Sequence, residues 1–304
     1  MRIGVVGTGA LGRHHVRILA ADPAAELVGI FDTDRKVAER VGNEFGAEVF
    51  DDLDSLAEGL EAAVVAVPTV DHCEVGCNLL ERGIHVLVEK PIASTLEEAD
   101  RLVAAAGDRV LAVGHVEYFN PAVQRLMGVE GQAGFVEIHR LAVFTPRSLD
   151  IDVVLDLMIH DLQILHALDD SPVSEVRATG ISVLSSRIDI ANARVALESG
   201  CVANITASRV SSQKVRKLRV FFPDQGYYSV DYQGQEVQGF RLQVGDESRN
   251  IIPDPLLVEK REPLKEELGA FLARCRGEDS ALVDGRQGRR ALKTAFRVLE
   301  AISA

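Results

Sequence analysis

The first 113 residues alternate short, uninterrupted apolar runs with segments of helical periodicity, and this alternation limits the possible folds more than any other feature of the chain. We expect strands at residues 3–6, 27–31, 49–50, 62–67, 85–88 and 110–113. We expect helices at residues 13–21, 35–45, 53–59, 72–82 and 96–106, the last beginning at a capping box of Thr95 and Glu98. Strands that are apolar throughout are buried on both faces, so the pattern predicts a parallel sheet with helices on both sides. Right-handed crossovers then give a doubly wound α/β fold.

The rhythm changes after about residue 118. One long helix at residues 151–168 precedes a series of alternating strands, at 173–185, 188–197, 201–209, 217–222, 227–232 and 236–244. Two helices, at 264–276 and 286–302, close the chain. This order predicts an α+β domain with an open, largely antiparallel sheet. We therefore expect two domains, residues 1–118 and residues 119–304, with the C-terminal helix a candidate to pack back on the first domain.

A glycine-rich turn follows the first strand and opens the first helix, with the residues Gly7, Thr8, Gly9, Ala10, Leu11 and Gly12. Gly7 permits the tight turn, Gly9 lets backbone N–H groups approach a pyrophosphate, and Gly12 allows the helix to pack closely on the strand. Asp32, at the end of the second strand, is placed to accept hydrogen bonds from ribose hydroxyls and to repel a 2′-phosphate. The sequence therefore predicts a Rossmann domain that binds NAD rather than NADP, with the neighbouring Arg35 acting against that preference. A glycine turn without a ligand is the alternative.

Two further strand ends carry residues suited to chemistry, and ligands of such sheets bind beyond the carboxyl ends of the strands. The run Pro68-Thr69, with His72, follows the fourth strand, and the run Glu89-Lys90-Pro91 follows the fifth. A lysine directly after a buried strand and before a rigid proline is expected at the ligand edge. A charge that only solvates the end of a strand is the alternative.

The predicted helix at residues 151–168 has twelve apolar residues among eighteen and one narrow polar stripe. At about 100° per residue, its polar positions fall within about 80° of one another, namely Asp152, Asp156, His160 and Gln163. An imidazole with a carboxylate four residues away is a tunable proton acceptor near neutral pH. A narrow exposed face with a solvated Asp–His pair is the alternative. No third residue has convincing metal-ligand spacing, so we expect no metal site.

Charge and composition exclude several classes of partner. The chain has 33 Lys and Arg against 46 Asp and Glu, a net charge of −13, which disfavours nucleic acid and anionic membranes. The four cysteines are too few for a disulfide framework, and Cys73 and Cys77 fit one buried helix face. No apolar run is long enough to span a membrane, and Met1-Arg2 leads into a strand without a signal-peptide layout. We therefore expect a cytoplasmic protein.

Four motifs occur in one order along both domains: G-T-G-A-L-G at 7–12, V-P-T-x-x-H at 67–72, E-K-P at 89–91 and D-L-M-I-H-D at 156–161. Together they resemble the Gfo/Idh/MocA family of NAD(P)-dependent sugar oxidoreductases, over essentially the whole chain. The resemblance implies that Lys90 lies beside the nicotinamide and positions the reacting hydroxyl, that His160 is the general base, and that Asp156 completes the catalytic set. It also implies cofactor contacts from the glycine turn, Asp32, Pro68, Thr69, His72, Glu89, Lys90 and Pro91.

Three segments, at 114–122, 144–161 and 191–210, resemble more narrowly the bacterial members that act on UDP-N-acetylglucosamine. This likeness implies NAD-dependent oxidation of the C3 hydroxyl of a UDP-N-acetylhexosamine, with substrate contacts from His115, Tyr118, Asn120, Arg147 and Asp161. The chain departs from this pattern at two positions near the expected sugar site: Tyr118 replaces an expected Arg, and Gln163 replaces an expected acidic residue. A group of basic residues is suited to a pyrophosphate, or equally to solvated strand ends: Arg147, Arg209, Lys214, Arg216 and Lys217.

Several alternatives to this function remain open at the level of sequence. They are an NAD-dependent glycosidase, another sugar or cyclitol dehydrogenase on the same fold, and a non-catalytic NAD-binding regulator. The Lys90, Asp156 and His160 set argues against a regulator, because a sensor needs no proton-transfer groups. The open sheet has apolar positions on both faces and must cover the second one, so we expect a homodimer or homotetramer.

Overall fold

A computed structural model describes residues 1–145, 151–245 and 249–304 of the chain, in two units. The first unit comprises Met1–Val116 and Leu264–Arg289, and the second comprises Glu117–Pro263 and Arg290–Ala304. The first boundary lies two residues before the expected one. Residues 264–289, which we expected in the second domain, group with the first.

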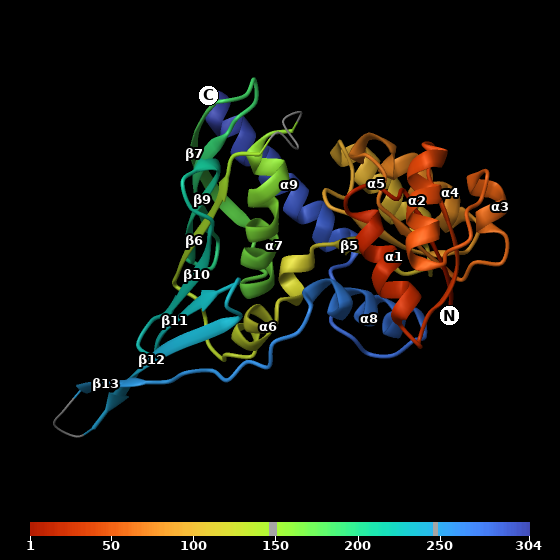
Figure 1. The fold of residues 1–304 in the computed structure, drawn as a ribbon. Helices are drawn as coiled ribbons and strands as arrows, with labels where there is room; N and C mark the ends of the chain where they lie inside the picture. The colour runs from red at the N-terminus through yellow and green to blue at the C-terminus, as the bar shows by residue number, and fades with distance from the viewer. Residues whose placement is uncertain (146–150, 246–248) are drawn as a thin grey trace. The chain divides into compact units, whose positions relative to one another are not determined.

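The first unit contains a five-stranded parallel sheet in the order β2-β1-β3-β4-β5 (Figure 1). Its strands are β1 (Arg2–Val6), β2 (Glu26–Phe31), β3 (Ala62–Val65), β4 (His85–Glu89) and β5 (Leu111–Gly114). The connecting helices are α1 (Gly12–Ala21), α2 (Arg35–Phe45), α3 (Leu53–Ala57), α4 (His72–Glu81) and α5 (Leu96–Ala106). The parallel pairing and the order, which reverses at β1, confirm the predicted doubly wound fold. The expected strand at 49–50 is only an isolated bridge between Ile30 and Val49.

A C-terminal segment completes the core of this first unit. Helix α8 (Pro263–Cys275) contributes the fully buried side chains of Leu268, Phe271 and Leu272. They belong to the same apolar cluster as residues of β1 and α1. Further along, the Val113 N–H donates to the Val283 carbonyl at 2.9 Å. These contacts explain why residues 264–289 belong with a sheet whose strands all lie in the first 114 residues.

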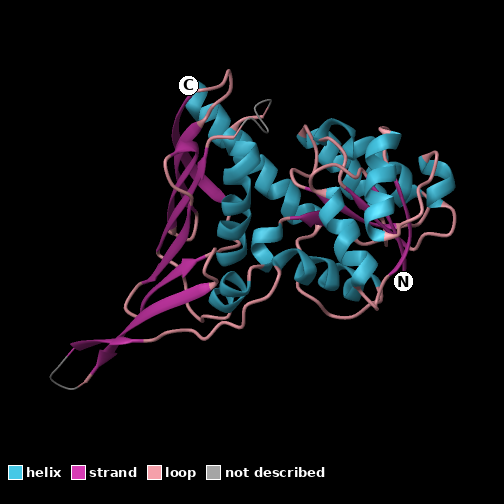
Figure 2. Cartoon of the chain, viewed as in Figure 1, coloured by secondary structure: helices cyan, strands magenta, loops and turns pink. Residues whose placement is uncertain are grey.

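The second unit is built on an eight-stranded sheet in the order β13-β12-β11-β10-β6-β9-β8-β7 (Figure 2). Its strands are β6 (Phe135–Val143), β7 (Val173–Ile181), β8 (Ile190–Leu197), β9 (Val202–Ser211), β10 (Val215–Phe222), β11 (Gly226–Asp231), β12 (Glu236–Val244) and β13 (Arg249–Pro253). Every neighbouring pair is antiparallel except β6 and β9, so the predicted largely antiparallel sheet is confirmed. Strands β6 and β13 and the short helix α6 (Pro121–Met127) were not predicted.

Helices of the second unit pack on one face of this sheet. Figure 1 shows α7 (Ile159–Leu168) beside the strands, with part of α9 (Gly285–Ser303) next to it. The imidazole of His166 on α7 lies 2.8 Å from the Thr294 hydroxyl on α9, and Arg297 of α9 donates to the Val173 carbonyl of β7. The opposite face exposes polar side chains such as Arg194 and Lys217. None of the described helices is long and apolar enough to cross a membrane.

The expected helix at 151–168 has a different winding at its start. Its first turn is a π-helix, η3 (Val154–Met158), in which the Ile159 N–H donates to the Val154 carbonyl five residues back. Helix α7 continues from Ile159. Asp152 precedes the helix, and its carboxylate accepts the Ile188 N–H at 2.9 Å. The uniform 100° spacing assumed for the polar stripe is therefore wrong from residue 152 to residue 158.

Candidate active site

The carboxyl ends of the parallel strands bring most of the predicted cofactor residues to one edge of the first unit. In the register of the sheet, Val6 lies beside both Phe31 and Val65, and Val65 lies beside Val88. At the other end of this row, Glu89 lies beside Gly114. The residues that follow these positions emerge together at this edge: Gly7, Asp32, Ala66, Lys90 and His115.

The glycine turn is shaped for close approach of a ligand. Gly7 has φ +85°, and a Cβ there would lie 2.6 Å from the Ala66 carbonyl oxygen. A Cβ on Gly12 would lie 1.9 Å from the Gly7 carbonyl oxygen. A Cβ on Gly9, in contrast, would meet nothing within 4 Å, and Ala10 and Leu11 beside it are exposed. No described side chain caps α1, while the Arg13 and His14 N–H groups donate to the Gly9 and Leu11 carbonyls. The partial positive charge of this helix N-terminus favours a phosphate.

Asp32 is tied directly to this turn. One carboxylate oxygen accepts the Thr8 backbone N–H at 2.6 Å and the Thr8 hydroxyl at 3.0 Å, and the other accepts the Asp34 N–H at 2.9 Å. Thr8 is buried and Asp32 is half-buried. Arg35 pairs with the carboxylates of Glu39 and Asp51. The edge therefore presents a fixed carboxylate where a ribose would lie, and the residues present fit a dinucleotide.

At this edge of the sheet, Glu89 contacts other residues of the protein rather than a ligand. Its carboxylate lies 2.7 Å from the His15 Nε2 and accepts the Lys90 backbone N–H at 3.2 Å. Burial alone would raise the pKa of Glu89, but the His15 contact and the Lys90 charge outweigh burial and leave the pKa lowered. Glu89 is therefore a buried anion beside the half-buried Lys90, and the expected cofactor contact from Glu89 is corrected to an internal one.

His72 also differs from its expected role. Its ring is buried, with Nδ1 2.9 Å from the Pro91 carbonyl and Nε2 3.0 Å from the Val67 carbonyl. Burial lowers the pKa of His72, although both carbonyls favour the protonated ring. Because both ring nitrogens lie beside backbone carbonyls, His72 links the turns after β3 and β4, and its ring contacts the protein itself rather than making the expected cofactor contact. Of its neighbours, Pro68 is exposed and Thr69 half-buried at that edge, while Pro91 is buried.

His115 lies at the end of β5, in the first unit. It is buried, and burial together with the Lys90 charge lowers its pKa to about 3, although Glu89 opposes the shift. The imidazole is therefore neutral at physiological pH and adjoins a cation. A neutral ring beside Lys90 is suited to hydrogen bonding with a hydroxyl.

The proton-transfer candidates of the second unit lie on the segment that begins with the π turn. Asp156 is half-buried within η3, and His160 lies in the first turn of α7 with 8% of its surface exposed. Gln163 is 3% exposed. The alternative of a solvated Asp–His face is therefore excluded. No group of three or more His, Cys, Asp or Glu side chains suited to a metal ion occurs within the described ranges.

Asp161, expected to contact substrate, forms a buried ion pair instead. It is 0% exposed, and its two carboxylate oxygens accept from Nε and Nη2 of Arg140 at 2.9 and 2.6 Å. The Nη1 of Arg140 donates to Glu117 at 2.8 Å, and Glu117 also accepts from Arg216 at 2.6 Å. Both oxygens of the fully buried Asp161 are thus bound by Arg140, and the expected substrate contact is corrected to an internal ion pair.

The remaining predicted substrate residues are placed as follows. Asn120 is buried, accepts the Ala122 N–H as the cap of α6 and donates to the Tyr232 carbonyl, so its role is structural rather than the expected substrate contact. Tyr118 is half-buried and packs edge-to-face on Phe119. Arg147 lies outside the described residues. Of the basic residues suited to a pyrophosphate, Arg209 is buried and engaged within the protein, and Arg216 pairs with Glu117.

Two buried ionisable residues were missed: Arg140, which contacts Asp161, and Glu267, whose pKa is affected by Glu89. Arg140 lies on the inward face of β6 with Val136 and Ile138, so a period-2 reading of that strand would have placed it inside. Glu267 lies on the apolar stripe of α8, three residues after Leu264 and four before Phe271, and is 1% exposed. In both cases the sequence offered one signal of a buried ionisable group: a charged residue type at a position that the strand or helix periodicity assigns to the apolar face.

Comparisons with known proteins identify the family of this chain. Residues 1–115 match the GFO_IDH_MocA model, described as an oxidoreductase family with an NAD-binding Rossmann fold. A UDP-N-acetylglucosamine 3-dehydrogenase from Acidithiobacillus ferrooxidans is 37% identical over 313 residues, covering 100% of this chain and 98% of the relative. The chain belongs to the Gfo/Idh/MocA oxidoreductase family. The family predicted from four motifs is thereby confirmed, and the chain is a dehydrogenase-type oxidoreductase.

A solved structure with the same printed name and organism, and one further relative, also match this oxidoreductase over nearly its whole length. A solved structure of UDP-N-acetylglucosamine 3-dehydrogenase GnnA from A. ferrooxidans superposes with a TM-score of 0.92 at 36% identity, covering 99% of this chain and 97% of that one. Inositol 2-dehydrogenase from Rhizobium meliloti is 24% identical over 325 residues, covering 100% of this chain and 97% of the relative. The family therefore includes members with different named substrates.

Proposed function

We propose that this oxidoreductase uses NAD to oxidise a secondary hydroxyl of a nucleotide sugar, the C3 hydroxyl of a UDP-N-acetylhexosamine. The observation that carries the reaction type is the position of Lys90, at the same sheet edge as the glycine turn and beside anionic Glu89. The substrate is supported by the full-length likeness to a UDP-N-acetylglucosamine 3-dehydrogenase.

In the proposed reaction, the carbinol group of the substrate loses a hydride and a proton, and each side chain of the site has one role. NAD, when bound, accepts the hydride that leaves the carbinol carbon. The Lys90 ammonium stabilises the negative charge that develops on the hydroxyl oxygen as the ketone forms. The His160 imidazole accepts the hydroxyl proton, and the Asp156 carboxylate stabilises the resulting imidazolium. Glu89 and His15 hold the chain at Lys90 in place.

The proposed preference for NAD over NADP rests on Asp32 and Arg35. The carboxylate of Asp32 is fixed by Thr8 and Asp34 at the ribose position, where it would repel a 2′-phosphate. Arg35, the nearby cation that acts against this preference, is held by Glu39 and Asp51.

The test is reduction of NAD by purified protein, followed by absorbance, with a panel of UDP-N-acetylglucosamine, UDP-N-acetylgalactosamine, UDP-glucose and myo-inositol. We expect the N-acetylhexosamines to be used and the Lys90→Met variant to lose about 100- to 1,000-fold in kcat while still binding NAD. Lys36→Met, on the exposed face of α2, is the matched control. Oxidation of myo-inositol alone would replace the sugar nucleotide with a cyclitol, and full activity of Lys90→Met would refute its role.

We also propose that the chain forms a homodimer or homotetramer through the sheet face opposite α7. Cross-strand partners on that face form an aromatic row across four strands, namely Phe135, Phe221, Tyr227 and Phe240. Their successive ring centroids lie 5.8, 5.5 and 5.3 Å apart, and all four rings are half-buried. Light scattering should give a multiple of 33.0 kDa that falls to one chain in Phe221→Asp. A wild-type monomer would overturn this proposal.

A cytoplasmic location is proposed on the state of the cysteines. All four are free thiols, and Cys73, Cys77 and Cys201 are buried. Free thiols are typical of a reducing compartment.

A further inference from the structure

The segment from residue 151 to residue 161, which contains Asp156 and His160, is bounded by two buried arginines. Arg140 on β6 is 2% exposed and Arg209 on β9 is 6% exposed. These strands are the parallel pair of the sheet, and Arg140 lies opposite Ala207 in their register. The two guanidinium groups thus come from neighbouring strands of one rigid layer.

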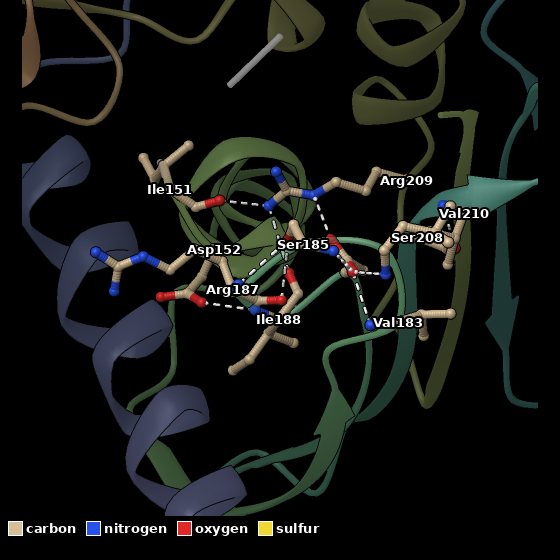
Figure 3. A network of polar contacts seen from close by, with 11 residues as sticks. Ile151, Asp152, Val183, Ser185, Arg187, Ile188, Ser208, Arg209 and Val210 are labelled. Carbon is tan, nitrogen blue, oxygen red and sulfur yellow. Dashed lines mark hydrogen bonds and ion pairs between the residues drawn. The ribbon is translucent and has the colours of Figure 1, made fainter. Parts of the chain in front are cut away.

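Arg209 holds the start of the segment (Figure 3). Its Nη2 donates to the Ile151 carbonyl and, at 3.3 Å, to the Ile188 carbonyl. The next residues of the segment are tied to the same point, since Asp152 accepts the Ile188 N–H and the Val153 N–H donates to the Ile188 carbonyl at 3.0 Å.

Asp189 supplies the buried negative charge opposite Arg209. The Arg209 Nε forms an ion pair at 3.6 Å with one Asp189 oxygen, which also accepts the Ser185 hydroxyl at 2.6 Å. The other Asp189 oxygen accepts the backbone N–H groups of Val183, Leu184 and Ser185. Burial would raise the pKa of Asp189, but these hydrogen bonds outweigh it and leave the pKa lowered. The ionised form of Asp189 is therefore favoured beside the guanidinium.

Arg140 holds the other end of the segment. Its planar fork makes two hydrogen bonds to Asp161, the residue directly after His160, and a third to Glu117. The ring of Tyr232 lies 5.2 Å from the Arg140 guanidinium carbon, and Arg216 pairs with Glu117 on the same side. A bidentate pair allows only one relative orientation of its two partners.

The π turn lies between these two fixed points. A π turn holds one more residue per turn than an α-helix, and such turns occur often at functional sites. With Ile151 and Asp161 anchored, the winding at residues 154–158 determines the directions in which the Asp156 and His160 side chains leave the helix. Buried ion pairs add little net stability over apolar side chains of the same size, but they do fix a geometry.

We propose that Arg140 and Arg209 are positioning residues that hold the π turn and so orient Asp156 and His160 for proton transfer. This inference rests on the proposed function of His160. It assigns no substrate contact to either arginine, and it differs from the earlier interpretation of Arg209 as a pyrophosphate ligand.

The test uses Arg140→Lys and Arg209→Lys, which keep the buried charge but lose the planar fork. Arg101→Lys is the matched control, because Arg101 is exposed on α5 of the first unit and has no part in the proposed site or interface. We measure kcat, KM and NAD affinity, the pH profile of kcat, the NMR titration of the His160 imidazole, and hydrogen exchange of residues 151–165. The two variants should lower kcat by about 10- to 100-fold with NAD affinity unchanged, shift the His160 titration, and speed exchange in that segment.

The outcomes separate this inference from the proposed function. If the wild type oxidises none of the sugars, the function fails, while the His160 titration and the exchange of 151–165 still test the arginines. If both variants match the wild type in titration, exchange and kcat, the inference is overturned. Faster exchange across the whole sheet with an unchanged His160 titration would also overturn it, because the arginines would then be structural only. If Arg140→Lys does not fold, Arg209→Lys decides the question.

Discussion

The Glu89 carboxylate and the His15 imidazole lie 2.7 Å apart in the interior of the first unit, with both side chains buried. The same carboxylate accepts the backbone N–H of Lys90. A residue of α1, directly after the glycine turn, thus holds the strand end that carries the proposed catalytic lysine. The buried contact between Glu89 and His15 therefore links the helix that follows the glycine turn to the strand end that carries Lys90.

The contact between Glu89 and His15 predicts that the free energies of unfolding of the wild type and of a Glu89 variant differ by an amount that depends on pH. Because the pKa of Glu89 is lowered from its usual 4.5, ionised Glu89 adds stability above that value, and this stability is lost as the pH falls through the lower folded pKa. Glu89→Gln should therefore be less stable than the wild type at pH 7, and the difference should narrow below about pH 4.5. Urea unfolding at several pH values measures it. A difference that stays constant from pH 7 to pH 4 would contradict the assignment.

For Glu267 we expect the opposite dependence of the free energy of unfolding on pH. Neither of its carboxylate oxygens has a hydrogen-bond partner among the described residues, and burial, followed by the charge of Glu89, raises its pKa well above the usual 4.5. A raised folded pKa means stability that is complete below about pH 4.5 and is lost as the pH rises. Glu267→Gln should therefore stabilise the protein, by more at pH 8 than at pH 5. Thermal unfolding at both values tests this, with the exposed Glu58→Gln expected to show no such trend.

Gly9 and Gly12 should respond differently to the same methyl group. Gly9→Ala fits the folded chain, so its melting temperature should stay near that of the wild type while NAD affinity falls about 10-fold or more, because the pyrophosphate approaches there. Gly12→Ala puts a Cβ on the Gly7 carbonyl and should destabilise by roughly 2–4 kcal/mol. Calorimetric titration and melting curves separate the two effects. Equal loss of stability in both variants would show that the turn is only structural.

Asp32 predicts the cofactor preference. Like charges about 4 Å apart near a protein surface repel by about 4 kcal/mol, so Asp32→Ser should raise the ratio of NADP to NAD affinity by about 10-fold or more. Titration with both dinucleotides measures the ratio. Asp22→Ser, on the loop after α1, serves as the control. If the wild type already binds NADP more tightly than NAD, the proposed preference is wrong.

The first unit was predictable because its signals are local. Helices α2 and α5 have the predicted bounds, since each begins at a residue that caps it, Asp34 and Thr95, and the capping box with Glu98 is present. The apolar runs of β1 and β3 have no polar alternation, so burial on both faces followed directly. The glycine spacing likewise placed the turn correctly between β1 and α1, at the carboxyl edge of the sheet.

The interior charges were not predictable in this way, because their partners are distant in sequence. Arg140 contacts Asp161 and Glu117, which are 21 and 23 residues away, and its side chain interrupts the apolar alternation that would have revealed β6. Asn120 and Asp161 had the residue types of substrate ligands, and only tertiary contacts show that the protein itself occupies them. The sequence pattern indicates which side chains have the chemistry to bind a substrate. The packing of the folded protein decides which of them are not already bonded within it.

The participation of α8 in the first core has a consequence for biosynthesis. Residues 1–116 leave the ribosome before α8, yet the apolar cluster that includes Ile3, Ile18 and Leu19 is closed by Leu268 and Phe271, which are made only after the strands of the second unit. Until α8 is made, the nascent nucleotide-binding unit therefore exposes an apolar surface of the kind that chaperones recognise, and truncation before residue 264 leaves that surface permanently uncovered.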